Sequence, residues 1–287
     1  MAEVITFANM KGGVGKTTLC VNVAFDLFVQ GNRVLLVDND PQFNATTFLM
    51  SPQTYLSNVI NARDAKTIVD IYERPPRAGK ASRSEVRADD VIYGQYEYTD
   101  RPIKLDLIPS RLELYETLDN ASQKDLKLNK FLKKVQSAYD YILIDCPPTP
   151  SVLTRAAFAA SRHVVIPVTP DHFATLGLPQ FLATLRNFKE ELTDEHNVEV
   201  RGVVLTRVPN AESAPVSQAI ADVRHATSEY NLPLLKSSLP EMAIFKRAIW
   251  KSQPVHELRG RGTSTRGDAS RAIRKIANEI CVGLGKN

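Results

Sequence analysis

The segment that decides the fold reads Lys-Gly-Gly-Val-Gly-Lys-Thr-Thr and spans residues 11–18. It follows the apolar run at residues 3–8, which is typical of a β-strand, and it precedes residues 18–28, whose apolar positions recur at helical spacing. A glycine-rich turn between a strand and a helix lets backbone N–H groups and the helix dipole hold phosphate oxygens. Lys16 is then expected to reach the β and γ phosphates, and the Thr17 hydroxyl to ligate Mg²⁺. The segment therefore predicts a phosphate-binding loop.

The rest of the chain extends this first strand–loop–helix unit. A second apolar run at residues 33–38 completes a βαβ unit. Further strand-like runs, most of them separated by stretches of helical periodicity, lie at residues 105–109, 141–145, 163–167 and 200–206. This alternation predicts an α/β fold with a doubly wound, mostly parallel sheet flanked by helices. A length of 287 residues fits a single domain, 1–287.

Composition narrows the class of protein further. The hydrophobic share of 43% and the charged share of 24% are those of a globular chain. No run approaches the roughly 20 apolar residues of a membrane-spanning helix, and the first strand-like run begins near Met1, so a cytoplasmic protein is expected. Residues 75–87 are polar and without apolar period, and they predict an exposed loop. Residues 260–267 are rich in glycine and arginine, and they predict a flexible connection to a last helix.

Acidic residues stand at the ends of two strand-like runs. The run at 33–38 continues into Asp38-Asn39-Asp40-Pro41-Gln42, which places two carboxylates at the carboxyl edge of the sheet. Both are expected to face the phosphates, although the same composition also suits a simple turn after a strand. The run at 141–145 ends in Asp145, the arrangement in which a carboxylate holds Mg²⁺ through water.

These motifs together resemble the ParA/MinD superfamily of ATPases. Residues 11–18 match in full its deviant phosphate-loop motif, in which Met10 stands where the standard pattern has glycine. Residues 38–42 and the Asp-Cys-Pro-Pro segment from Asp145 resemble its two switch sequences. The resemblance implies a P-loop NTPase fold, ATP and Mg²⁺ as cofactors, and hydrolysis of ATP to ADP and phosphate. It implies nucleotide contacts by Lys11, Gly12, Gly13, Val14, Gly15, Lys16, Thr17 and Thr18.

The resemblance also implies individual roles. Lys11 matches a lysine that reaches across a homodimer interface to the nucleotide of the other subunit, and it joins Lys16 as a catalytic candidate. Asp40 matches the residue that orients the attacking water and the Mg²⁺ shell, so the expected metal site comprises Thr17, Asp40 and Asp145. The positions that contact the base in relatives match Arg207, Asn210, Pro240, Glu241 and Met242.

Members of the superfamily bind either nucleoid DNA, like ParA, or lipid, like MinD. The formal net charge is +4, and the late part of the chain, about 246–287, is notably basic. Cations with few aromatic residues among them suit phosphate contacts without base reading. The candidates for DNA binding are Arg224, Lys246, Arg247, Lys251, Arg259, Arg261, Arg266, Arg271, Arg274 and Lys275. The simpler interpretation of this set is a solvated face.

The lipid alternative rests on the last helix. Its apolar residues Ile273, Ile276, Ile280 and Leu284 share one face, with basic residues near another, which is a pattern found in membrane-surface helices. Such a stripe more often packs on its own domain. DNA is therefore the favoured surface, with a nucleoid-associated location and no stable membrane association expected.

The resulting functional hypothesis is a partition or positioning ATPase. ATP closes a nucleotide-sandwich dimer, the dimer binds nonspecific DNA, and a ParB-like or other adaptor protein stimulates hydrolysis. The cargo would be a plasmid, a chromosome or a protein assembly. A third class, a metabolic or metal-delivery P-loop enzyme, needs an extra site, and the scattered histidines and the cysteines Cys20, Cys146 and Cys281 offer no metal-ligand spacing.

Overall fold

The computed structural model describes residues 1–73, 86–119, 124–171, 174–191, 198–211, 213–258 and 263–284. Nearly all of the loop expected at 75–87 lies outside these residues, and so do Arg259 and Arg261. The basic segment at 246–287 is described up to residue 284, apart from 259–262.

The described strands form one seven-stranded sheet in the order β3-β4-β2-β5-β1-β6-β7. Their bounds are Glu3–Phe7 for β1, Val34–Asp38 for β2, Tyr93–Glu97 for β3, Lys104–Ile108 for β4, Tyr141–Asp145 for β5, His163–Val168 for β6 and Glu199–Leu205 for β7. All neighbouring pairs are parallel except β3 with β4. The predicted α/β fold with a mostly parallel, doubly wound sheet is confirmed. The edge strand β3 escaped prediction because its sequence, Tyr-Gly-Gln-Tyr-Glu, is polar and half exposed.

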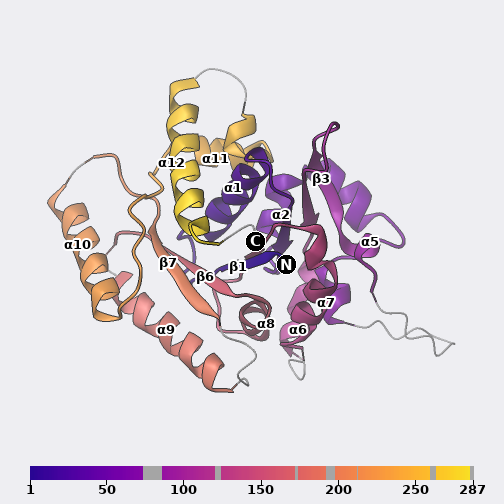
Figure 1. Cartoon of the computed structure of the whole chain (residues 1–287), viewed down its shortest axis with the longest axis horizontal. Coiled ribbons are helices and arrows are strands. Elements are labelled where there is room, and N and C mark those ends of the chain that lie inside the picture. The colour runs from indigo at the N-terminus through magenta and orange to yellow at the C-terminus, as the bar shows by residue number, and fades with distance from the viewer. Residues whose placement is uncertain are drawn as a thin grey trace.

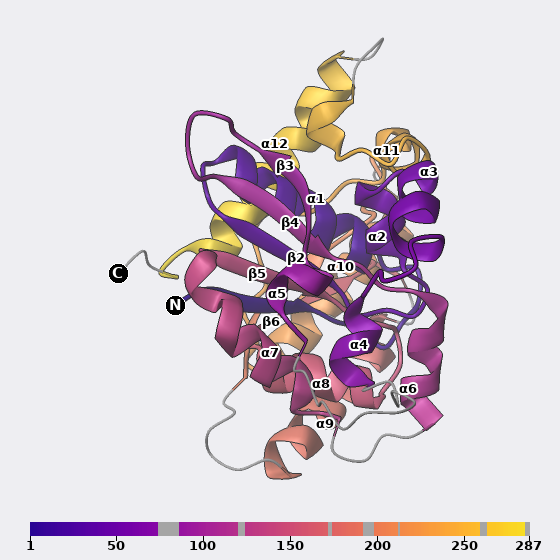
Figure 2. The same ribbon diagram turned by 90° about the vertical axis from the view of Figure 1, so that its right-hand side faces the viewer.

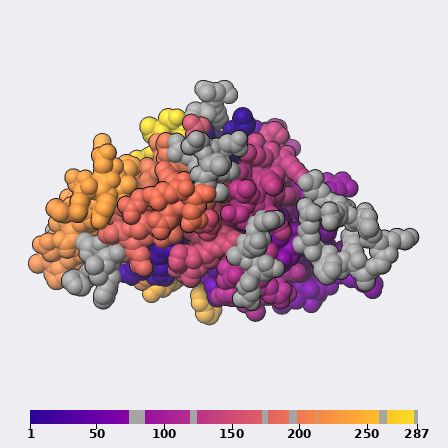
Figure 3. Space-filling view, turned by 90° about the horizontal axis from the view of Figure 1, so that it is seen from below, coloured from indigo at the N-terminus to yellow at the C-terminus, as the bar shows by residue number. Residues whose placement is uncertain are grey.

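Helices cover both faces of the sheet (Figures 1 and 2). One face packs on α1 (Lys16–Val29), α2 (Asn44–Leu49), α11 (Ala243–Trp250) and α12 (Thr263–Cys281). The other face packs on α7 (Lys127–Val135), α8 (Val152–Ala160), α9 (Ala174–Glu191) and α10 (Ala214–Glu229). In the view from below, α10 lies at the left-hand end beside α9 (Figure 3). Shorter helices lie at Pro52–Tyr55 (α3), Ile68–Tyr72 (α4), Ala88–Val91 (α5) and Glu116–Asp119 (α6).

The last helix, α12, lies against α1 with its apolar face inward. Ile273, Ile276 and Ile280 are fully buried. The helix begins at Thr263, so the flexible connection expected at 260–267 is wrong for residues 263–267. A glycine inside a helix costs only about 1 kcal/mol relative to alanine. Burial of this stripe, which begins at Ala269, offsets that cost and extends the helix toward its N-terminus.

Polar contacts fasten α12 to the rest of the domain. Arg274 Nε donates to both carboxylate oxygens of Asp26 on α1, at 2.7 Å each. Arg201 Nε on β7 donates to the Ile280 carbonyl at 2.6 Å. The Glu279 carboxylate accepts from backbone N–H groups at 2.7 and 2.9 Å. The apolar face that the lipid alternative requires is therefore already occupied by the protein core. In the described residues, no helix combines the length and the apolar character needed to cross a bilayer.

We expect Arg274→Ala to lower the free energy of unfolding by about 2 kcal/mol at neutral pH, because the buried Asp26 carboxylate loses a charged donor. The exposed neighbour Lys275 provides a matched control, and Lys275→Ala should change stability by less than about 0.5 kcal/mol. Urea unfolding measures both variants. Equal stability of the two variants would make Arg274 a surface cation like its neighbour.

The same contact has a predictable pH dependence. Burial alone would raise the pKa of Asp26, but hydrogen bonds from His256, Arg274 and Gln30 hold this pKa below its ordinary value. A lowered folded-state pKa stabilises the fold above the unfolded pKa of about 3.9, and this stabilisation is lost as the pH falls through the folded value. The difference between wild type and Arg274→Ala should shrink in that acid range.

Candidate nucleotide-binding site

The loop between β1 and α1 is held in shape by glycine geometry and by side chains from other strands. Gly13 and Gly15 have φ values of +75° and +83°, a region that other residues rarely adopt. Gly15 is also the residue before the first turn of α1, so the helix N-terminus points at the loop. Thr206 Oγ1, at the end of β7, donates to the Val14 carbonyl at 2.6 Å. Asn9 Oδ1 accepts from the Lys11 N–H at 3.0 Å. These contacts preorganise the loop for an anion.

Lys16 is the cation inside this loop. Its Nζ donates to the Lys11 carbonyl at 3.0 Å, and the residue is only 7% exposed. Burial lowers the pKa of Lys16, while the charges of Asp145 and Asp40 oppose that shift. A phosphate group in the loop would add further negative charge beside Nζ and favour the charged form. Lys16 is thus placed where the motif requires a phosphate contact.

Thr17 and Asp145 form the expected metal-side pair. Thr17 Oγ1 donates to Asp145 Oδ2 at 2.6 Å. The other carboxylate oxygen, Oδ1, is buried and has no hydrogen-bond partner among the described residues. Burial raises the pKa of Asp145 well above its ordinary value, and the charge of Asp38 on the neighbouring strand adds to this. A hydroxyl and an unsatisfied carboxylate oxygen are hard donors that fit Mg²⁺.

The two carboxylates after β2 have different surroundings. Asp38 is fully buried and accepts from both N and Oγ1 of Thr46 at 2.7 Å, which caps the first turn of α2. Burial raises the pKa of Asp38 to about 7. Asp40 lines the cavity beside the loop, and its Oδ1 accepts from Gln42 N at 2.9 Å. Burial also raises the pKa of Asp40, against the Gln42 hydrogen bond and the charge of Lys16. The expectation that both carboxylates face the phosphates is wrong for Asp38. Its carboxylate accepts hydrogen bonds from the backbone N–H and the hydroxyl of Thr46 instead.

A cavity of about 450 Å³ opens from the loop toward the segments after β7. Four of the predicted base contacts line it, namely Arg207, Pro240, Glu241 and Met242. Asn210 is not among the described lining residues, and its side chain donates to the Glu241 carbonyl at 3.4 Å. Arg207 adopts a left-handed φ of +51° and donates to the Gly13 carbonyl at 3.0 Å. Near this segment, Leu234 forms an isolated bridge to Val203 of β7, and Pro240 forms one to Val208.

Gln42, Pro148 and Leu239, which belong to segments already assigned to the site, also line the cavity. Six further lining residues were not predicted to lie there from the sequence: Asn44, Thr47, Phe48, Phe245, Lys246 and Ile249. Those at 44–48 belong to α2 and those at 245–249 to α11. The sequence did indicate that these helices lie near the site, because both directly follow segments already assigned to it. Lys246, predicted to contact DNA, lines the nucleotide cavity.

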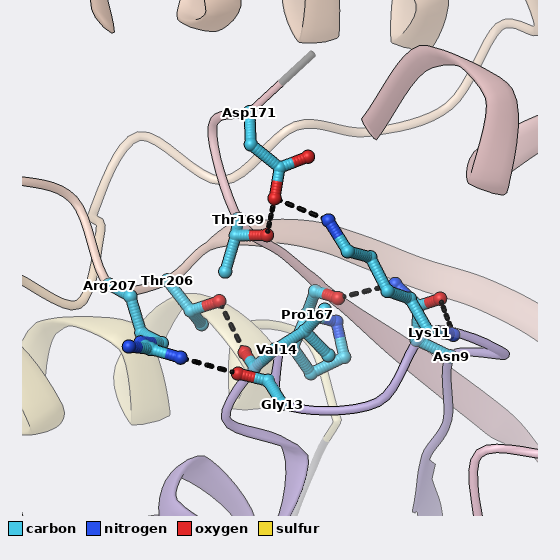
Figure 4. Close-up of polar contacts among 9 residues, drawn as sticks. All are labelled: Asn9, Lys11, Gly13, Val14, Pro167, Thr169, Asp171, Thr206 and Arg207. Atoms are coloured by element: carbon cyan, nitrogen blue, oxygen red, sulfur yellow. Dashed lines mark hydrogen bonds and ion pairs between the residues drawn. The ribbon is translucent and has the colours of Figure 1, made fainter. Parts of the chain in front are cut away.

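The first lysine of the motif points in a different direction from the second. The Lys11 side chain reaches Asp171, just after β6, and forms an ion pair with its carboxylate (Figure 4). Thr169 Oγ1 donates to the same carboxylate at 2.7 Å. Lys11 is absent from the described lining of the cavity, which begins at Gly12. Figure 4 shows Lys11 and Arg207 on opposite sides of the loop.

The eight predicted DNA-binding residues that the structure describes do not form one surface. Arg224 lies on α10, apart from the others (Figure 1). Some of the arginines have intramolecular partners, since Arg266 donates to the Leu258 carbonyl, Arg271 pairs with Asp268, and Arg274 pairs with Asp26. Arg247 and Lys251 lie together beside a second groove, and Lys275 is exposed on α12.

This arrangement of loop, buried lysine, hydroxyl, carboxylates and cavity defines a P-loop protein with a site for a nucleoside triphosphate. The chain matches the family model AAA_31, described as an AAA domain, over residues 2–199. It is 31% identical to the sporulation initiation inhibitor protein Soj of Bacillus subtilis (strain 168) over 277 residues, which cover 95% of this chain and 98% of Soj. It is 34% identical to the chromosome partitioning protein ParA of Caulobacter vibrioides over 283 residues, covering 97% and 93%. The chain belongs to the ParA/Soj-type family of P-loop partition ATPases.

Solved structures share the whole fold. The Cyanothece McdA(D38A)–ATP complex superposes with a TM-score of 0.78 at 20% identity, covering 100% of this chain and 98% of that one. The cobyrinic acid a,c-diamide synthase of Mycobacterium smegmatis, with an ATP analog and magnesium, gives 0.75 at 22% identity, covering 100% and 96%. At these identities the likeness shows a common fold.

Proposed function

We propose that this protein hydrolyses ATP as a nucleotide-sandwich dimer, binds nonspecific DNA in the ATP state, and positions a plasmid, a chromosome or a protein assembly with an adaptor protein. One observation carries the proposal: the two lysines of the loop diverge. Lys16 Nζ lies inside its own loop, whereas Lys11 turns outward to Asp171.

An outward lysine has a chemical use in a dimer. Hydrolysis builds negative charge around the γ-phosphoryl group, and a second cation from a partner subunit stabilises it. Lys11 takes this role by leaving Asp171 of its own chain for the nucleotide of the other subunit. Asp40, which lines the cavity, would orient the attacking water. Thr17 and Asp145 would hold a Mg²⁺ ion, whose charge would offset that of the phosphates.

DNA is the surface that the fold supports better than lipid. The apolar face of α12 is buried, and Arg201, Arg274 and Glu279 fasten the helix to the domain. The relatives named chromosome partitioning proteins point to the same choice. Binding through phosphate contacts would be independent of sequence and sensitive to salt.

The test of the dimer uses Lys11→Ala. This variant should bind ATP as a monomer but fail to dimerise, because the contact to the partner's phosphates is lost while Lys16 stays in place. Asp171→Asn is the companion variant: it removes the charge that holds Lys11 in its own chain and should leave ATP-driven dimerisation intact or stronger. Light scattering with ATP, ADP and no nucleotide measures the molar mass. A normal ATP-dependent dimer of Lys11→Ala would remove the trans role.

A further inference from the structure

Asn39 lies between the two carboxylates of the 38–42 segment, yet its side chain points into the protein interior. It is fully buried, and it is not among the described residues that line the nucleotide cavity. Its Oδ1 accepts from the Tyr72 hydroxyl at 2.8 Å, and its Nδ2 donates to the Leu153 carbonyl at 2.8 Å. Its backbone N–H donates to the Asp145 carbonyl at 2.9 Å. Asn39 therefore connects the 38–42 segment to α4, to α8 and to the end of β5.

The orientation of the Asn39 amide follows from the chemistry of its neighbours. A backbone carbonyl can only accept, so the NH₂ group must face Leu153 and the oxygen must face Tyr72. Burial raises the pKa of Tyr72 well above its ordinary value, so this hydroxyl keeps its proton and acts as the donor. The side chain of Asn39 thus has one orientation that satisfies both partners.

The partners of Asn39 are themselves anchored in the core. Tyr72 is fully buried at the end of α4, and its carbonyl accepts from the Lys127 side chain of α7. At the start of α4, the Ile68 N–H donates to the Pro109 carbonyl at 3.0 Å. Leu153 is fully buried in the first turn of α8. Tyr72 and Leu153 belong to the core on the face of the sheet that α7 and α8 cover. They are fixed points against which the 38–42 segment is held.

An apolar pair would fill the same space as Asn39 and Tyr72. Leucine has the branched shape of asparagine, and phenylalanine lacks only the hydroxyl group of tyrosine. Replacing both partners of a buried hydrogen bond by apolar groups of the same shape can leave stability nearly unchanged. Packing alone therefore does not require polar groups at these positions. The hydrogen bond adds direction, because it restricts distance and angle, and a satisfied buried network specifies one arrangement.

Asp40 follows Asn39 directly and depends on its placement. The Asp40 N–H donates to Asp38 Oδ1 at 3.2 Å, and Asp40 Oδ1 accepts from Gln42 N at 2.9 Å. Both contacts lie within the 38–42 segment, so they shape the segment without fixing it against the rest of the protein. The contacts of Asn39 do fix it, because they reach α4, α8 and β5.

We infer that Asn39 is a positioning residue for ATP hydrolysis, because its contacts with Tyr72, Leu153 and Asp145 fix the backbone from which Asp40 reaches the cavity. The inference rests on the proposed function, in which Asp40 orients the attacking water. Asn39 also joins Asp40 to Asp145, the proposed Mg²⁺ ligand, through the hydrogen bond to the Asp145 carbonyl. Misplacement of a reacting group by about 1 Å can cost about 100-fold in rate, so a small shift of the Asp40 carboxylate is sufficient to slow hydrolysis.

The test compares stability with rate in Tyr72→Phe, Asn39→Leu and the double variant Asn39→Leu/Tyr72→Phe. Each single variant leaves a buried polar group without its partner and should lower the urea midpoint, whereas the double variant should regain much of that loss. Single-turnover hydrolysis of bound ATP should be about 10- to 100-fold slower in Asn39→Leu and should stay slow in the double variant. The Kd for a fluorescent ATP analogue should stay close to that of wild type. A rate that recovers together with the midpoint would make Asn39 merely structural and overturn the inference.

Two matched controls remove buried polar contacts at the opposite edge of the sheet. Asn32, before β2, donates from Nδ2 to the Leu27 carbonyl at 2.9 Å. The hydroxyl of Tyr139, before β5, donates to Asp106 Oδ2 at 2.6 Å. Asn32→Leu and Tyr139→Phe should lower the urea midpoint and leave the rate of hydrolysis near that of wild type. If both controls slow hydrolysis as much as Asn39→Leu does, the rate reports stability alone and the inference is overturned.

A double-mutant cycle with Asp40 separates this inference from the proposed function. Because Asn39 acts through Asp40, Asn39→Leu should slow hydrolysis little further in a protein that already carries Asp40→Ala. Losses that multiply would mean that Asn39 acts by another route, which would overturn the inference and leave the proposed role of Asp40 standing. A wild-type protein that does not hydrolyse ATP would instead remove the proposed function, and the inference with it.

Discussion

Replacing Lys16 by alanine should abolish ATP binding at micromolar concentrations. The buried ammonium group lies inside the loop, where it would donate to two phosphate oxygens. Hydrogen bonds to charged groups contribute about 1.5–3 kcal/mol each, so the loss of two weakens binding by at least about 100-fold. Titration with a fluorescent ATP analogue measures the affinity, and circular dichroism controls for folding.

The variant also loses the contact from Nζ to the Lys11 carbonyl, so some loosening of the empty loop is expected. Loosening alone would cost far less affinity than the loss of the cation. A folded Lys16→Ala protein with wild-type affinity for ATP would refute the nucleotide site at this loop.

Replacing Asp40 by alanine should lower the turnover of bound ATP by about 10²- to 10⁴-fold while leaving ATP binding in place, since positioned acid–base groups contribute rates of this order. Asp40 lines the cavity, and its carboxylate is fixed by Gln42 N. Slower hydrolysis should also prolong the life of the ATP dimer. Single-turnover hydrolysis at saturating ATP gives the rate of the chemical step.

Asp38→Asn serves as the comparison for Asp40. Asp38 is buried and bonded to Thr46, so its replacement should reduce stability and disturb α2 more than it slows chemistry in the molecules that remain folded. If Asp38→Asn stops hydrolysis and Asp40→Ala does not, the two carboxylates have been assigned the wrong way round.

The parts predicted well from sequence are those fixed by local chemistry. Strands such as Tyr141–Asp145 are continuous apolar runs, and the glycines at 13 and 15 adopt the left-handed conformations that the loop motif requires. The edge strand β3 was missed because its polar, half-exposed sequence lacks an apolar run, and the start of α12 was missed because it precedes the buried stripe that begins at Ala269.

The parts that could not be predicted depend on contacts between distant segments. Lys11 and Asp171 are 160 residues apart, and no local pattern pairs them. The basic set illustrates the same limit: Arg274 and Lys275 are neighbours in sequence, yet one pairs with buried Asp26 and the other is exposed. The number of basic residues in the C-terminal part of the chain does not distinguish these two roles, because the packing of α12 against α1 determines which side chain is paired and which is exposed.

The most direct test of the account is binding of the wild-type protein to nonspecific duplex DNA and, in parallel, to anionic vesicles, each with ATP, ADP or no nucleotide at moderate salt. The account predicts salt-sensitive binding to DNA that requires ATP, and no binding to vesicles in any state. ATP-dependent binding to vesicles without binding to DNA would contradict it, and it would require α12 to leave the core on which its apolar face now packs.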